Sequence, residues 1–162
     1  MNPLGVATPE TLGFGDRLYA AMRAHGPVCV GIDPHASLLA QWGLDDDANG
    51  VREFSLRVVE ALGGRAAAFK PQAAFFERHG SRGVAVLEEV IAACREVGTL
   101  CIVDAKRGDI GNTSRMYART FFQEYDLDAL TVAPYMGEDS VTPFLGYDGK
   151  WVVLLALTSN KG

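Results

Sequence analysis

Two acids and a lysine lie within six residues of one another in the segment Asp104-Ala-Lys-Arg-Gly-Asp109, whose lysine is Lys106. The segment directly follows the wholly apolar run 100–103, so its charges are expected where a buried strand reaches solvent. Lysines beside an aspartate keep it ionised, and a fixed ammonium group can stabilise negative charge that develops on carbon. A solvated surface charge run is the simpler alternative, and the apolar run before Asp104 argues against it.

Three further polar residues, Asp33, Lys70 and Ser159, stand at or just after the ends of other apolar runs. The carboxyl ends of parallel strands lie on one face, so these side chains are expected to converge with Asp104. Burying a lysine at the end of a buried strand costs free energy unless its ammonium group is paired. Asp104 could form such an ion pair with Lys70. On its own, Lys70 would equally fit a lysine that extends its ammonium group to solvent at a sheet edge.

The apolar runs alternate with amphipathic segments along the whole chain. Unbroken apolar runs are typical of strands covered on both faces, and the predicted strands are 28–32, 66–69, 99–103, 129–133 and 151–157. Helices are predicted from Thr8 and Pro9 to before Gly26, over 51–62, 81–97 and 112–125, and briefly near Asp139. This α/β pattern predicts a TIM (β/α)8 barrel, with residues 1–162 as a single incomplete barrel domain of about five βα units.

The composition argues against some classes of binding partner and some cellular locations. The net charge of −5 argues against binding a nucleic-acid polymer, because phosphate backbones are bound by surplus Lys and Arg. The three cysteines are odd in number and lack a CxxC spacing, which favours reduced thiols in a cytoplasmic protein over disulfides or a zinc site. No signal peptide is recognised and no apolar run is long enough to cross a bilayer, so no membrane partner is expected.

The residues around the strand ends resemble the orotidine 5′-phosphate decarboxylase family. The spacing of Asp104, Lys106 and Asp109 matches the DxKxxD motif of the wider suprafamily. The segments Gly-Ile-Asp-Pro at 31–34 and Phe-Lys-Pro-Gln at 69–72 narrow the resemblance to the longer bacterial branch, and it extends from about residue 12 to the end. The resemblance implies decarboxylation of orotidine 5′-phosphate to UMP in de novo pyrimidine biosynthesis, with no metal and no organic cofactor.

The resemblance also assigns roles to individual residues. It implies that Lys106 stabilises a carbanion at C6 of the pyrimidine and then protonates it. It places Asp104 beside the carboxylate of the substrate, and Asp33 and Lys70 on the hydroxyl groups of the ribose. The expected catalytic set is therefore Lys106, Asp104, Asp109 and Lys70.

Other roles implied by the resemblance depend on a second subunit. Asp109 is expected to reach across the interface of a homodimer into the partner's site, with Ile110 and Thr113 contributing from the same side. Ser159 is expected to contact the edge of the pyrimidine. In the family, loops after strands seven and eight bind the phosphate group of the substrate. The chain is therefore interpreted as an N-terminal portion that would be poorly active alone, because remote binding energy drives chemistry at the ring.

Two alternatives remain open. Related suprafamily members, the sugar-phosphate decarboxylases and hexulose-phosphate synthases, use a DxKxxD site with Mg²⁺. The interleaved lysines argue against Mg²⁺, and the contexts of Lys70 and Ser159 favour a pyrimidine nucleotide. The chain could instead be a non-catalytic barrel fragment that acts as an assembly module. Arg107 is interpreted as a surface charge or a dimer contact.

Overall fold

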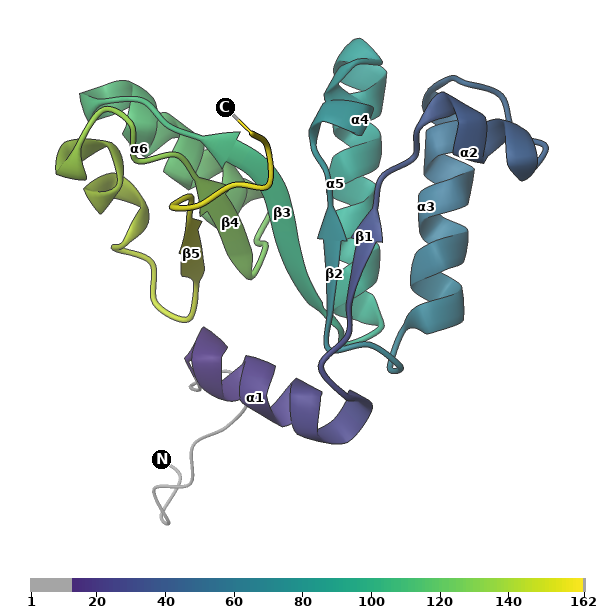
Figure 1. The fold of residues 1–162 in the computed structure, drawn as a ribbon, viewed down its shortest axis with the longest axis horizontal. Helices are drawn as coiled ribbons and strands as arrows, with labels where there is room; N and C mark the ends of the chain where they lie inside the picture. Colours follow the sequence, from purple (N-terminus) through teal and green to yellow (C-terminus); the bar gives the residue numbers. More distant parts are fainter. Residues whose placement is uncertain (1–12, 162) are drawn as a thin grey trace.

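A computed structural model describes residues 13–161 and contains a single five-stranded sheet (Figure 1). All neighbouring strands are parallel and follow chain order, which confirms the predicted succession of βαβ units. The strands are β1 (Cys29–Ile32), β2 (Ala68–Pro71), β3 (Leu100–Arg107), β4 (Ala129–Val132) and β5 (Trp151–Leu154).

Each predicted helical segment contains a helix, apart from details at the ends, and further short helices occur outside those segments. Thr8 and Pro9, predicted to start the first helix, lie outside the described residues. The short α2 and α4 were not predicted, and the helix predicted over 112–125 ends in π-helical geometry. The helices are α1 (Phe14–His25), α2 (Ala36–Gln41), α3 (Ala48–Leu62), α4 (Ala74–Glu77), α5 (Gly80–Glu96), α6 (Gly111–Arg119), the π-helix η1 (Thr120–Glu124) and the 3₁₀-helices η2 (Glu138–Ser140) and η3 (Thr142–Phe144).

The predicted ends of three strands were wrong. β2 continues through Lys70, and β3 continues through the charged segment to Arg107, because backbone pairing with a neighbouring strand does not need an apolar side chain. β5 is shorter than predicted and ends at Leu154, where its pairing with β4 ends. Leu157, which was expected inside the strand, is 97% exposed. Lys70, Asp104 and Lys106 therefore project from strands and not from flexible loops.

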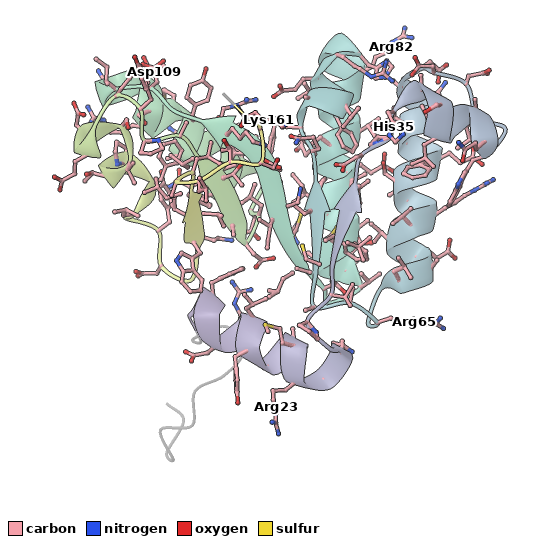
Figure 2. All side chains as sticks on the ribbon, viewed as in Figure 1. Arg23, His35, Arg65, Arg82, Asp109 and Lys161 are labelled. Atoms are coloured by element: carbon pink, nitrogen blue, oxygen red, sulfur yellow. The ribbon has the colours of Figure 1, made fainter. Side chains whose placement is uncertain are left out.

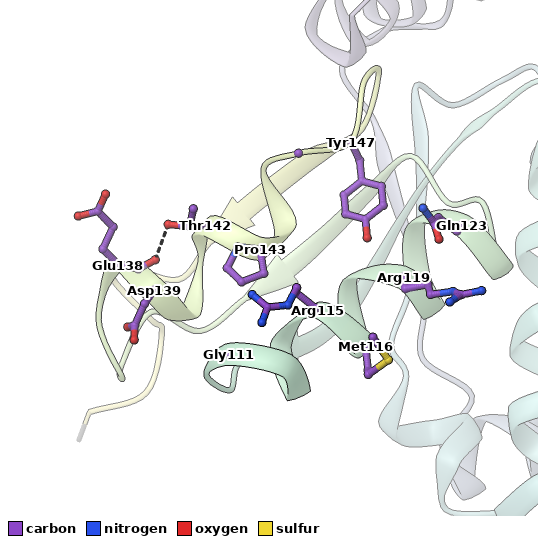
Figure 3. A pocket seen from close by; sticks show the side chains of 11 residues that line it. Gly111, Arg115, Met116, Arg119, Gln123, Glu138, Asp139, Thr142, Pro143 and Tyr147 are labelled. Atoms are coloured by element: carbon purple, nitrogen blue, oxygen red, sulfur yellow. Dashed lines mark hydrogen bonds between the residues drawn. The ribbon is translucent and has the colours of Figure 1, made fainter.

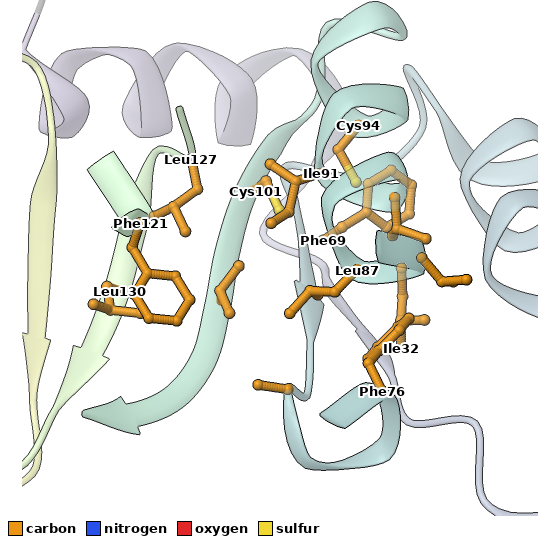
Figure 4. Close-up of a cluster of buried hydrophobic side chains, with 14 of the residues drawn as sticks. Ile32, Phe69, Phe76, Leu87, Ile91, Cys94, Cys101, Phe121, Leu127 and Leu130 are labelled. Carbon is orange, nitrogen blue, oxygen red and sulfur yellow. The ribbon is translucent and has the colours of Figure 1, made fainter. Parts of the chain in front are cut away.

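The main hydrophobic core lies between the sheet and the helices on its outer face. Phe69, Phe76, Leu87 and Ile91 are at the centre of this core (Figure 4). The edge strand β5 is less covered, and its Trp151 remains 47% exposed. The packing therefore holds the middle strands β2, β3 and β4 firmly, and these are the strands that carry the charged residues.

Helix α1 crosses the amino ends of the strands (Figure 1). Its Phe14 packs with buried residues of β2, β3 and β4. The centres of the Phe14 and Trp151 rings are 5.0 Å apart, in an edge-to-face arrangement. Arg17 of the same helix forms an ion pair with Asp128 at 2.5 Å and donates to the Gly149 carbonyl at 2.7 Å. The amino end of the sheet is thus covered by α1, which leaves the carboxyl ends of the strands as the open face.

Candidate active site

Asp104 is the centre of a hydrogen-bonded cluster at the carboxyl ends of β2, β3 and β4. Its Oδ1 accepts from the Lys106 ammonium group at 2.5 Å, and its Oδ2 accepts from the Lys70 ammonium group and the Gln72 amide, each at 3.2 Å. The backbone of Asp104 is fixed as well, because the Ala73 N–H donates to its carbonyl at 3.1 Å. The structure thus brings together three of the predicted residues, Asp104, Lys70 and Lys106.

The backbone around Lys106 departs from regular strand geometry. Its φ is +48°, in the left-handed region that residues with a Cβ rarely adopt. The register between β3 and β4 shifts there, since Val103 pairs with Leu130 and Arg107 pairs with Val132. Such a bulge bends the strand and re-aims its side chains, and it lies at the residue whose ammonium group contacts Asp104.

Electrostatics keep Asp104 ionised. Its side chain is only 12% exposed, and burial alone would raise its pKa. Hydrogen bonds from Lys106, Thr131 and Lys70 outweigh burial and lower the pKa of Asp104 below its ordinary value. The two lysines are more accessible, with side chains 34% (Lys70) and 46% (Lys106) exposed. The cluster is therefore a buried carboxylate that presents two ammonium groups toward the open face.

Asp33 follows β1 and has a carboxylate oxygen in need of a partner. Its Oδ1 is buried and accepts no hydrogen bond from the residues that the structure describes. The His35 ring and the Asp33 carbonyl are 2.8 Å apart, so the loop is anchored through the backbone and not through the carboxylate. Buried carboxylate oxygens are normally paired, so this oxygen of Asp33 is an exception among the described residues.

The turn after Lys106 is as tight as the glycines in its sequence predict. A Cβ on Gly108 would lie 2.6 Å from the Ala133 carbonyl oxygen, and Gly111 has a φ of +57°. Within this turn, Asp109 accepts the Ile110 N–H at 2.7 Å through its own carboxylate. Figure 2 shows Asp109 at the rim beside the start of α6. No hydrogen bond in the described chain joins it to Asp104.

The other predicted residues are not brought into the cluster. Ile110 is 51% exposed, and Thr113 and Ser159 are exposed. Within residues 13–161, none of the three forms a hydrogen bond with Asp104, Lys70 or Lys106. The geometry of this single chain accordingly assigns them no part in the Asp104 cluster.

Two residues to which the sequence analysis gave no role are part of the surroundings of Asp104. Gln72 and Thr131 donate to its carboxylate. Arg107, interpreted as a surface charge or a dimer contact, lines the cavity beside Asp104, where its guanidinium group pairs with Glu77 and donates to the Ala105 carbonyl at 3.0 Å. The same group lies over two aromatic rings, those of Tyr117 at 5.7 Å and Phe121 at 5.5 Å.

A cavity of about 390 Å³ opens directly beside the cluster. It lies between α4 and β3 and is lined by Gln72, Phe75, Glu77, Asp104, Lys106 and Arg107, among others. A larger hollow of about 910 Å³ lies between α6 and the η2–η3 segment (Figure 3). That hollow contains none of the predicted site residues, so the smaller cavity is the one that adjoins the chemistry.

Two further properties bear on the class of site. Among residues 13–161, no three His, Cys, Asp or Glu side chains are grouped so that they could hold a metal ion. Over the same residues, no helix has both the length and the apolar character needed to cross a membrane.

Comparison with known proteins identifies the family to which this site belongs. Residues 26–162 match the model of the orotidine 5′-phosphate decarboxylase / HUMPS family. The chain belongs to this family. A curated orotidine 5′-phosphate decarboxylase from Streptomyces coelicolor is 54% identical over 153 residues, which are 91% of this chain and 55% of the relative. One from Bacteroides fragilis is 52% identical over 137 residues, 83% of this chain and 50% of the relative.

Solved structures of the decarboxylase family have the same fold. A Streptomyces avermitilis structure described as an orotidine 5′-phosphate decarboxylase gives a TM-score of 0.89 at 52% identity, covering 99% of this chain and 57% of that one. The Leishmania donovani OMP decarboxylase gives a TM-score of 0.81 at 41% identity, covering 93% and 56%. The five strands thus form part of a (β/α)8 barrel, which confirms the predicted fold class. The chain spans about half the length of the curated relatives it matches.

Proposed function

We propose that this chain supplies the decarboxylation centre for converting orotidine 5′-phosphate to UMP in pyrimidine biosynthesis. The observation that carries the proposal is Asp104, fixed between the ammonium groups of Lys70 and Lys106 beside a cavity at the strand ends. Two relatives whose sequences are 54% and 52% identical to this chain are named orotidine 5′-phosphate decarboxylase, and these names support the same substrate. The barrel segment is proposed to work in the cytoplasm as a single incomplete domain and without a metal or organic cofactor.

The chemistry needs a fixed cation beside C6 of the pyrimidine. When the bond between C6 and the carboxylate breaks, its electron pair stays in an sp² orbital of C6, where the ring π-system cannot take it up. The Lys106 ammonium group stabilises this pair and then donates its proton to C6, which leaves a neutral amine that solvent reprotonates. Asp104 holds the ammonium group in place and lies beside the substrate carboxylate, where like charges repel until carbon dioxide departs.

Substrate binding is assigned to the neighbouring strand ends. Asp33 directly follows β1, and its carboxylate is proposed to accept a ribose hydroxyl group, while Lys70 can donate to the same sugar. Ser159, which follows β5, is proposed to contact the pyrimidine edge. The phosphate would be held by parts of the barrel that this segment lacks in comparison with its relatives, so the segment alone is expected to turn over poorly.

A homodimer is part of the proposal. Asp109, Ile110 and Thr113 lie on or beside the turn that begins α6, and the last two are exposed. Side chains placed in this way can reach a neighbouring subunit, and they are proposed to complete the partner's site.

The magnesium-dependent alternative fits the cluster less well. Both oxygens of Asp104 already accept hydrogen bonds, including one from each of two lysines. A divalent cation on this carboxylate would have to displace an ammonium group, and it would then lie beside positive charge. The non-catalytic alternative gives no reason for two lysines that gather on one buried aspartate at the strand ends.

Ligand preference separates these alternatives. The test protein is a chimera in which residues 1–162 are joined to the part of the S. coelicolor relative outside the match, called here the completed chimera. Isothermal titration calorimetry in EDTA should show UMP binding at least about tenfold tighter than a hexulose 6-phosphate binds in Mg²⁺. Failure to bind UMP would support the non-catalytic reading, and Mg²⁺-dependent binding of the sugar phosphate would support the related synthases.

A further inference from the structure

We propose that Thr131 of β4 is a positioning residue whose hydroxyl group holds the Lys106 backbone in its left-handed conformation and orients the Asp104 carboxylate. The effect of Thr131 on turnover rests on the function proposed above, whereas its effect on the geometry of the cluster does not. Thr131 was expected to be an ordinary strand residue inside the apolar run 129–133.

The hydrogen bonds of Thr131 have only one consistent direction. Its Oγ1 lies 2.9 Å from the Lys106 backbone nitrogen, which can only donate. The hydroxyl group has one proton, and that proton goes to Oδ1 of Asp104, also at 2.9 Å. The same Oδ1 accepts from the Lys106 ammonium group at 2.5 Å. A closed ring therefore runs from the Lys106 backbone through Thr131 and Asp104 to the end of the Lys106 side chain.

Strand register gives Thr131 this place. Because Val103 pairs with Leu130 and Arg107 with Val132, Thr131 alone stands opposite the three residues 104–106. Just after the end of β4, the backbone N–H of Ala133 donates to the Arg107 carbonyl at 2.8 Å, past the bulge. Backbone strain such as the φ of +48° at Lys106 persists only where the surroundings hold it, and β4 supplies these restraints.

Burial makes the hydroxyl group hard to replace. Every residue of β4 is buried, and Thr131 is only 6% exposed. Valine has nearly the same shape and favours strands, but it would leave the Lys106 N–H without an acceptor and Asp104 with one donor fewer. Loss of that donor also removes one of the hydrogen bonds that lower the pKa of Asp104.

The chain offers a matched control at the other end of the sheet. Thr99 is likewise buried, at 5% exposed, and its Oγ1 accepts a backbone N–H, that of Gly64, at 3.2 Å. Thr99→Val therefore removes a comparable hydrogen bond beside the amino end of β3, away from the cluster. A merely structural effect of losing a buried hydroxyl group would be common to both variants, whereas a positioning effect belongs to Thr131 alone.

The direct test is a carbon-13 NMR titration of the aspartate carboxyl groups in the 162-residue chain, with Asp104 assigned from Asp104→Asn. Thr131→Val should raise the pKa of Asp104 by about half a unit or more, whereas Thr131→Ser and Thr99→Val should leave it near the parent value. Superimposable titrations for Thr131→Val and the parent would overturn the proposal. If circular dichroism shows Thr131→Val unfolded, Thr131→Ala replaces it in the same comparison.

Kinetics of the completed chimera test the consequence for turnover. Thr131→Val should lower kcat by about 10- to 100-fold with little change in KM and move the acid limb of kcat to higher pH, and Thr131→Ser should restore the parent behaviour. An unchanged kcat for Thr131→Val in an active chimera would contradict the positioning role. An inactive parent chimera would instead refute the proposed function, while the titration would still decide the role of Thr131.

Discussion

Replacing Lys106 by alanine in the completed chimera is expected to lower kcat/KM for orotidine 5′-phosphate by about 10⁴-fold. The substitution removes both the cation that stabilises the C6 electron pair and the proton that quenches it. The fold should survive, because the Lys106 side chain is 46% exposed. A steady-state assay of UMP formation measures the loss, and circular dichroism checks the fold.

The matched control for Lys106→Ala is removal of a cation from the opposite end of the strands. Arg65 is exposed, and Figure 2 shows it beside the turn that leads into β2 at the amino end. Arg65→Ala should leave kcat/KM within about twofold of the parent, because screening weakens exposed charges over more than about 10 Å. Comparable losses in the two variants, or near-normal activity of Lys106→Ala, would refute the role assigned to Lys106.

Replacing Asp104 by asparagine is expected to lower kcat/KM by about 10³-fold and to destabilise the chain at neutral pH. Without the carboxylate, the ammonium groups of Lys70 and Lys106 lose their shared counter-charge, and the amide oxygen of asparagine is a weaker, neutral acceptor for Lys106. The two lysines are partly exposed, so solvent screening limits the loss in the free energy of unfolding to about 1–2 kcal/mol. Urea unfolding measures this loss.

The stability difference between the parent and Asp104→Asn should depend on pH. The pKa of Asp104 is lowered in the folded chain, so its contribution is fully present above the unfolded value of about 3.9 and is lost as pH falls through the folded value. The difference in unfolding free energy should therefore be largest near neutral pH and shrink at acid pH. Asp148→Asn, at an exposed carboxylate, should show no such dependence. A difference that stays constant down to acid pH would contradict an ionised, paired Asp104.

The contact between Lys70 and Asp104 could be predicted from the sequence for a physical reason. Uninterrupted apolar runs indicate strands buried on both faces, and parallel strands bring their carboxyl ends to one edge. The structure places Lys70 and Asp104 on the adjacent strands β2 and β3, with their charged atoms 3.2 Å apart. What the pattern did not give was the point at which each strand ends, because hydrogen bonding continues past the last apolar side chain.

The bulge at Lys106 and the role of Thr131 could not be predicted in the same way. Threonine favours strands, so it fits an apolar run. The sequence pattern does not indicate which group its hydroxyl group will contact. That partner depends on a register shift between strands whose contacting residues are 25 positions apart. Gln72 lay within the Phe-Lys-Pro-Gln segment, so the resemblance could have pointed to it. Asp109, Ile110, Thr113 and Ser159 remain predictions, since the roles proposed for them need a bound nucleotide or a second subunit.

The central claim is that the cluster around Asp104 decarboxylates orotidine 5′-phosphate, and release of carbon dioxide by the completed chimera tests it most directly. Radiolabelled substrate carrying carbon-14 in its carboxylate should release labelled carbon dioxide in the presence of EDTA, with one UMP formed for each carbon dioxide. The 162-residue chain alone should release it far more slowly. A folded chimera that binds UMP but releases no carbon dioxide, or that does so only when Mg²⁺ is added, would contradict the claim.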